Sequence, residues 1–439
     1  MSTAPTRRLG PLALLESAVL VSGIGNGIAA VTIPWLVLER TGQATSAGLV
    51  GAATAIPLLF SALFSGSIVD TFGRKRTSII SDAFSALSVA AIPLVDRLLG
   101  LDMTLILILV VLGAVFDPAG ATAREAMIPE MGAEARWPLP RTNAVHEATW
   151  GVSFLIGPAI GGILIATVGP ATTLWATAAG FVFSCAIVTF IRAPGVGVPE
   201  KADRPSNVLA GSAEGVRLVW GDPLLRATTL VSMALVAVYM PIEGVVLPYI
   251  FQQQGRPAAL GLVLTALSAG GLVGALSYAA VGPRVRRYPV FAGAIVLAAL
   301  SILAMALAPT YGLLVAAAAL AGLFWGPVDP LINLAVQTRT DPVRRGRVLG
   351  VLMASFYAAG PLGYMGAAVV VERFGAQTAF VGLGVLILAV AVIAAPMPAL
   401  RRFDQPGAYE AAVDVTARIS SVADPRMPVP PPPDDSGRA

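Results

Sequence analysis

Four carboxylates stand inside long apolar stretches of the sequence, where a charged side chain needs a specific reason to be present. Glu243 lies two residues after Pro241, and Asp117 directly precedes a proline. Asp82 and Asp329 occupy two further apolar stretches. A carboxylate at the centre of a bilayer costs about 2.5–3.5 kcal/mol on insertion scales, and a buried carboxyl group can exchange protons near neutral pH. The four residues are therefore candidates for proton binding.

Other reactive side chains are scarce. The 439 residues include one cysteine, Cys185, one histidine, His146, and two lysines, Lys75 and Lys201. One cysteine and one histidine provide neither a disulfide nor a Cys/His zinc site, and neither lysine stands in the Gly-Lys-Ser/Thr order of a phosphate-binding loop. His146 beside Glu147 could relay protons, although a single histidine near a helix entrance is more typical of an interface. We expect no enzyme activity, no metal and no cofactor.

Composition indicates that these carboxylates are positioned by membrane-spanning helices. Hydrophobic residues make up 56% of the chain and charged residues 12%, against roughly 25% charged in soluble proteins. A helix crossing about 30 Å of hydrocarbon needs about 20 mostly apolar residues. Twelve stretches meet this condition: Leu12–Leu38, Ser46–Val69, Ser78–Val95, Met103–Ala123, Asn143–Val168, Ala171–Ile191, Leu225–Phe251, Ala259–Val281, Tyr288–Leu307, Tyr311–Leu334, Val348–Val371 and Thr378–Ile393. We expect an all-α membrane protein.

The basic residues predict the direction of the spans. With the N-terminus in the cytoplasm, every arginine and lysine lies on the cytoplasmic side except Arg40, Arg97, Arg256 and Arg373. This asymmetry is what the positive-inside rule requires, and one miscounted helix would destroy it. Both termini are therefore expected in the cytoplasm, with the protein in the cell membrane.

The two halves of the chain share landmarks in the same order. Gly157-Pro158 recurs as Gly360-Pro361, and Gly48-Leu49-Val50 recurs as Gly261-Leu262-Val263. Phe116-Asp117-Pro118 has a looser counterpart in Phe324-Trp325-Gly326-Pro327. We expect a six-helix bundle over 1–192, a cytoplasmic linker over 193–224, a second bundle over 225–400 and a disordered, proline-rich cytoplasmic tail over 401–439. Two matching bundles form an interface at mid-membrane.

The loop after the second span carries the most specific pattern. Its residues, Gly66-Ser67-Ile68-Val69-Asp70-Thr71-Phe72-Gly73-Arg74-Lys75-Arg76, resemble the loop motif of the major facilitator superfamily, with Thr71 where the family usually has arginine. The resemblance covers about Leu12 to Leu400 and implies two pseudo-symmetric six-helix bundles. It also implies that Gly66, Asp70, Gly73, Arg74 and Arg76 gate the cytoplasmic side. The equivalent loop of the second half lacks the aspartate, which predicts asymmetric gating.

The fifth span carries Gly157-Pro158-Ala159-Ile160-Gly161-Gly162, which is similar to the core of a motif of family exporters. Two upstream glycines of that motif are replaced by Ala144 and Ser153. Together with Phe116–Ile128 and Asn143–Gly162, this segment resembles the macrolide-efflux and siderophore-exporter branch. The resemblance favours export over uptake.

The same resemblance implies a central cavity lined by the first, fourth, seventh and tenth spans, where Asn26 and Tyr239 are candidate substrate contacts. Glu243 and Asp117 are the preferred coupling residues, followed by Asp82 and Asp329. Leu105–Ala123, in the fourth span, lacks the arginine found in many proton-coupled exporters of the family, so the resemblance leaves proton antiport open.

The leading hypothesis is a secondary transporter, a proton-driven exporter of drugs or hydrophobic metabolites. An uptake carrier of the same fold is the alternative, and a non-transporting membrane sensor or scaffold is an alternative of another class. The expected partners are a small-molecule substrate, protons and the lipid bilayer. We expect a monomer that binds no nucleic acid.

Overall fold

The computed structural model describes residues 8–192, 208–405 and 407, and within these ranges it contains helices and turns but no strand. Twelve helical segments in this part of the chain are long and apolar enough to cross a membrane. The predicted all-α membrane fold is confirmed. The predicted disorder of the tail falls almost entirely outside the described residues. A short 3-10 turn, Leu400–Asp404, begins that region.

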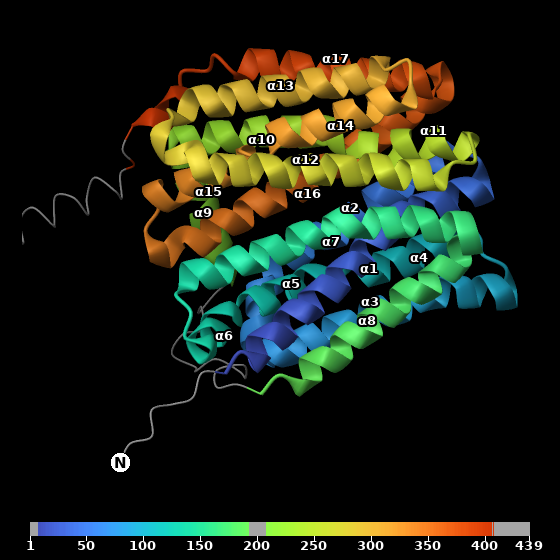
Figure 1. Cartoon of the computed structure of the whole chain (residues 1–439), viewed down its shortest axis with the longest axis horizontal. Coiled ribbons are helices and arrows are strands. Elements are labelled where there is room, and N and C mark those ends of the chain that lie inside the picture. Colours follow the sequence, from blue (N-terminus) through green and yellow to red (C-terminus); the bar gives the residue numbers. More distant parts are fainter. Residues whose placement is uncertain (1–7, 193–207, 406, 408–439) are drawn as a thin grey trace, which may run out of the picture.

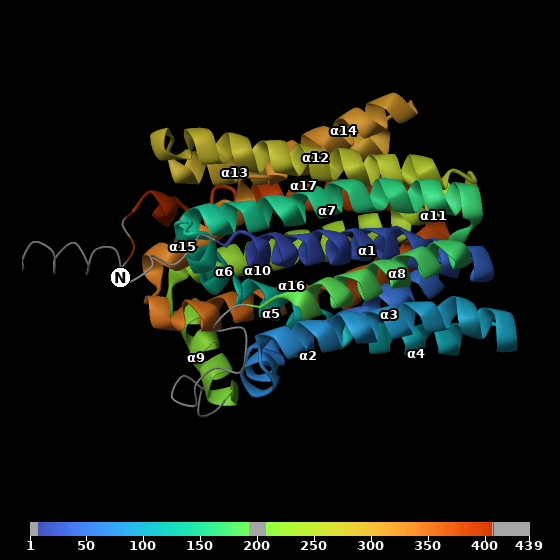
Figure 2. The ribbon, with the colours of Figure 1, turned by 60° about the horizontal axis from the view of Figure 1, so that its bottom comes forward.

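Six spans precede the linker and six follow it (Figures 1 and 2). In the first half the helices are α1 (Gly10–Thr41), α2 (Ala44–Phe72), α3 (Arg74–Leu99), α4 (Met103–Ala114), α5 (Asp117–Glu125), α6 (Ile128–Ala135), α7 (Leu139–Val168) and α8 (Pro170–Phe190). The linker contains α9 (Val208–Gly221). The second half consists of α10 (Pro223–Pro241), a π-helical turn (Ile242–Val246), α11 (Leu247–Gln253), α12 (Pro257–Val281), α13 (Arg287–Leu307), α14 (Tyr311–Trp325), α15 (Val328–Arg339), α16 (Pro342–Phe374) and α17 (Ala376–Ala394).

The fourth and tenth spans are broken at corresponding places. Asp117-Pro118 opens α5 directly after the break behind α4, and Asp329-Pro330 stands in the first turn of α15 after α14. Proline lacks a backbone N–H and clashes with the preceding turn, so each break falls where a proline can begin a helix. The structural counterpart of Asp117-Pro118 is therefore Asp329-Pro330. This corrects the looser match with Phe324–Pro327.

The fourth span is also longer than the sequence indicated. After the break it continues through α5 and α6, and its membrane-length segment runs from Met103 to Ala135. Arg124 consequently lies inside this span and is 1% exposed, rather than in a cytoplasmic loop. Leu105–Ala123 contains no arginine, but the helical segment continues past Ala123, so Arg124 belongs to it and was wrongly expected in a cytoplasmic loop.

Glycines allow close contact both within and between the halves. A Cβ on Gly27 of α1 would lie 2.9 Å from the Cα of Gly157 in α7, so neither position has room for a side chain. Gly161 also packs on α1, against Ile28. Gly162 faces the other half instead, with Gly261 of α12 beside it. Small residues permit such backbone contact in lipid, where helix association depends on packing rather than on the hydrophobic effect.

The two halves meet firmly at the end away from the linker. Glu372 of α16 accepts hydrogen bonds from the backbone N–H of Thr45, at 2.8 Å, and from its hydroxyl, at 2.7 Å. Deeper in the membrane, the ring of Tyr364 lies where side chains on Gly51 of α2 and Gly244 would otherwise extend. This conformation is closed at the Thr45–Glu372 end.

At the opposite end, α9 is bound to the beginning of α16. Glu214 forms ion pairs with Arg344, at 3.2 Å, and with Arg347. A Cβ on Gly215 would lie 2.5 Å from the carbonyl oxygen of Arg347, so the two helices touch through their backbones. Figure 2 shows α9 projecting from this end of the molecule. The part of the linker that the structure describes is thus attached to the second half.

We expect Gly322→Leu to destabilise the protein, because a Cβ there would lie 1.9 Å from the carbonyl oxygen of Leu267 in the neighbouring helix. Overpacking typically costs about 1–3 kcal/mol, and a backbone atom leaves little room to adjust. Gly293→Leu is the matched control, since nothing lies within 4 Å of its Cβ position. Thermal unfolding in detergent should show a lowered Tm for Gly322→Leu alone. Equal Tm values for both variants would contradict this packing.

Candidate transport site

A buried ion pair ties the first half together. Nη1 of Arg124 lies 3.0 and 3.1 Å from the two carboxylate oxygens of Asp82, which is 2% exposed. The hydroxyls of Ser22 and Ser184 donate to the same carboxylate at 3.1 and 2.6 Å. The network joins α1, α3, α5 and α8. Because both charges are compensated, Asp82 lies in a structural ion pair in this conformation.

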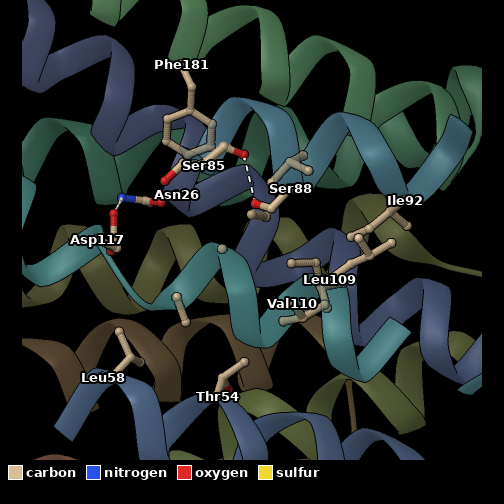
Figure 3. A pocket seen from close by; sticks show the side chains of 15 residues that line it. Asn26, Thr54, Leu58, Ser85, Ser88, Ile92, Leu109, Val110, Asp117 and Phe181 are labelled. Atoms are coloured by element: carbon tan, nitrogen blue, oxygen red, sulfur yellow. Dashed lines mark hydrogen bonds between the residues drawn. The ribbon is translucent and has the colours of Figure 1, made fainter. Parts of the chain in front are cut away.

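Asp117 has a different environment. It is partly buried, and Asn26 of α1 donates a hydrogen bond to its Oδ1 at 3.3 Å. Asp117 and Asn26 line a cavity of about 200 Å³ together with residues of α2, α3, α4 and α8 (Figure 3). The structure thus brings a predicted coupling residue and a predicted substrate contact together at one cavity.

Glu243 is the corresponding carboxylate of the second half. It lies in the π-helical turn that follows Pro241, and its Oε1 accepts a hydrogen bond from the hydroxyl of Tyr239 at 2.7 Å. The ring of Tyr239 stacks on Trp325 of α14, with ring centroids 6.2 Å apart and an interplanar angle of 11°. Such π-helical turns are rare and frequently occur at functional sites. Glu243 and Tyr239, predicted separately, form one pair.

Asp329 lies in the first turn of α15, directly after the break in the tenth span, and is exposed. Glu147 of α7, in the first half, is also exposed and close enough for the two negative charges to interact. Asp329 also accepts a side-chain hydrogen bond from Trp325. It thus lies near a carboxylate of the other half, whereas Asp82 is buried within the first half.

The gating motif is described only in part. Gly66 and Asp70 lie on helical backbone of α2, and the structure describes the contacts of neither residue. Gly73 has φ +88°, a conformation that favours glycine, and its N–H bonds to the carbonyl oxygen of Val69 at 2.8 Å. Arg74 forms an ion pair with Glu130 of α6, and Arg76 is exposed.

Sequence reasoning missed several polar residues around these sites. Arg124 stands seven residues after Asp117, which places both on one face of a continuous helix. Ser78, Ser81, Asp82, Ser85 and Ser88 recur at helical spacing in α3 and are buried. This stripe of polar residues in an apolar span could have indicated the network and the cavity wall.

A second buried pair was also missed. His146 Nδ1 lies 3.2 Å from Oε1 of Glu16, joining α7 to α1 near the linker end. The predicted relay through Glu147 does not correspond to this contact, because Glu147 points elsewhere and is exposed while His146 is 2% exposed. Among the described residues, no cluster of three or more histidine, cysteine or acidic side chains could hold a metal.

Comparison with known proteins identifies the family to which the chain belongs. A family profile described as transmembrane secretion effector, within the major facilitator superfamily, matches residues 2–416. The chain belongs to this superfamily. It is 40% identical to the multidrug efflux pump Tap of Mycobacterium tuberculosis over 398 residues, covering 90% of this chain and 95% of that pump. It is 22% identical to macrolide efflux protein A of Streptococcus pyogenes over 388 residues, with 88% and 95% covered.

The fold is shared with solved members of the superfamily. The nucleoside transporter NupG superposes with a TM-score of 0.73 at 13% identity, covering 88% of this chain and 98% of that one. At this identity the likeness establishes the fold alone. This major facilitator protein is a multi-pass membrane transporter and not an enzyme, as the sequence predicted.

We expect Asp82→Ala to destabilise the transporter by about 3–5 kcal/mol, because it leaves the guanidinium of Arg124 buried without a carboxylate. The double variant Asp82→Leu/Arg124→Met should recover much of this loss. Asp96→Ala is the control, since its partner Arg40 is largely exposed and such pairs contribute about 0–1 kcal/mol. Thermal unfolding in detergent measures all three. A double variant no more stable than Asp82→Ala would contradict the pairing.

Proposed function

We propose that this transporter exports drugs or other hydrophobic small molecules from the cytoplasm in exchange for protons. Export is supported by the 40% identity to a multidrug efflux pump over nearly the whole of both chains. It is also supported by the exporter-like motif of α7. Gly157 and Gly161 pack on α1 of the same half, and Gly162 packs on α12 of the other half. The distribution of basic residues supports cytoplasmic termini, and we propose that the transporter lies in the cell membrane.

The observation that carries the proton coupling is the pairing of two carboxylates with neutral groups. Asp117 accepts from an amide, and Glu243 accepts from a phenol, one in each half. A carboxyl group among neutral partners can exist with or without its proton, whereas a carboxylate in a buried ion pair must stay charged. Asp117 and Glu243 therefore remain our coupling residues, Asp329 is a further candidate, and Asp82 takes the structural role.

We infer that the halves move by alternating access, and the places where they touch support this. Thr45 bonds to Glu372, and Tyr364 packs against Gly51 of the first half, both toward the end away from the linker. With the termini in the cytoplasm this is the external end, and we interpret the conformation as cytoplasm-facing. In the opposite state, the motif containing Gly66, Asp70, Gly73, Arg74 and Arg76 closes the linker end against α16. The units that move are the bundles over 1–192 and 225–400.

Cells expressing Glu243→Gln or Asp117→Asn are expected to lose at least 90% of gradient-driven ethidium efflux, because neither amide can carry a proton. Glu39→Gln, which changes an exposed carboxylate at the end of α1, is the control and should retain full efflux. Real-time fluorescence of ethidium-loaded cells measures the rate, with and without a protonophore. Full protonophore-sensitive efflux by both site variants would overturn the coupling assignment, and accumulation of ethidium against its gradient would indicate uptake instead.

Joining the two halves at their closed end should stop transport. In a Cys185→Ser background, the pair Thr45→Cys/Glu372→Cys treated with a short thiol crosslinker is expected to lose efflux and to regain it after reduction. The control pair Arg40→Cys/Asp96→Cys bridges two helices of the same half at the same end, and its crosslinking should leave efflux unchanged. Efflux that continues after complete crosslinking of the first pair would exclude rocking of the halves.

A further inference from the structure

The cavity at Asp117 lies within the first half rather than between the halves. All of its lining residues belong to the first half, on α1, α2, α3, α4, α5 and α8. The central space of the fold, by contrast, lies where helices of both halves face each other. A volume of about 200 Å³ is large enough for a benzene ring with a small substituent, since an engineered cavity of about 150 Å³ holds benzene.

The cavity is polar at one end and apolar at the other. Asp117, Asn26, Ser85 and the ring of Phe181 gather at one end in Figure 3, while Ile92, Leu109 and Val110 lie toward the other. Two of the three hydroxyls on its walls bond to their own helices. Ser88 donates to the carbonyl oxygen of Ser85 at 3.1 Å, and Thr54 donates to that of Val50 at 2.9 Å. The third hydroxyl, that of Ser85, lies at the same end as Asp117, so a ligand needs its polar group at that end and an apolar group at the other.

The charge at the polar end is negative. The nearest cation is Arg124, and its guanidinium bonds to Asp82 and, at 3.4 Å each, to Ser78 and Ser22. Among the described residues, Asp117 accepts a side-chain hydrogen bond only from Asn26. Asp82, Arg124 and Asp117 together carry one net negative charge, and a carboxylate in such a place requires a proton or a cation.

We propose that this cavity of the first half binds the charged end of an organic cation, an ammonium group next to a ring or short alkyl chain. The ammonium group lies at Asp117 beside the face of Phe181, where a cation is attracted by both a carboxylate and an aromatic ring. The adjoining ring or chain occupies the end formed by Ile92, Leu109 and Val110. This inference rests on the proposed export function and names the substrate class and its place.

Binding of phenyltrimethylammonium to the purified full chain, measured by isothermal titration, tests the proposal. Ser88→Leu and Ala29→Leu each fill the cavity from a different helix, and each is expected to raise the Kd at least tenfold. Ser88→Ala keeps the volume and should stay within threefold of the wild type. Benzenesulfonate, an anion of similar size, is expected not to bind. Asp117→Asn should abolish the preference for the cation.

Elution volume and Tm identify the variants that remain folded. One folded variant, either Ser88→Leu or Ala29→Leu, is enough to test whether the cavity binds the cation. A wild type that does not bind the cation, or a folded filling variant that binds it normally, would overturn the proposal. Ethidium efflux by the wild type is measured separately. If the wild type exports ethidium but the filling variants bind the cation normally, the cavity is not the binding site and the export function stands. If the wild type exports no ethidium, the export function is wrong, and the binding measurements alone test the cavity.

Discussion

The cost of placing a charge inside the membrane governs the arrangement of this transporter. Arg124 is the one fully buried cation among the described residues, and Asp82 compensates it at 3.0 Å with two serines in support. Among the described residues, Asp117 and Glu243 instead accept side-chain hydrogen bonds from neutral groups, an amide and a phenol. The first half thus contains one carboxylate held in an ion pair and another bonded to a neutral amide.

Backbone irregularities place these groups. Prolines break the fourth and tenth spans at matching positions, and each break is followed by an aspartate in the first turn of a new helix. The seventh span changes to a π-turn at Glu243. An N-terminal first turn favours a negative side chain, which lowers the cost of keeping it in the membrane. Glycines elsewhere let helices approach closely, and the two halves are in backbone contact where Gly162 lies against Gly261.

Much of the fold could be predicted because apolar length and flanking arginines report directly on spans. The four intramembrane carboxylates could also be found, since each stands out from its surroundings. Their roles could not be assigned, because Asp82 and Asp117 look alike until α5 is seen to bring Arg124 to Asp82. The apolar run of the fourth span ends at Ala123, so composition alone assigns Arg124 to a loop and gives no sign that it pairs with Asp82 rather than with Asp117.

Proton movement driven by a substrate gradient alone tests whether Asp117 and Glu243 couple export to proton entry. Purified transporter is reconstituted in proteoliposomes that contain a pH-sensitive dye, with no initial pH gradient, and an ethidium gradient is imposed across the membrane. We expect a proton flux opposite in direction to ethidium, present in the wild type and absent from the doubly substituted Asp117→Asn/Glu243→Gln protein. Ethidium movement without any proton flux in the wild type would contradict it.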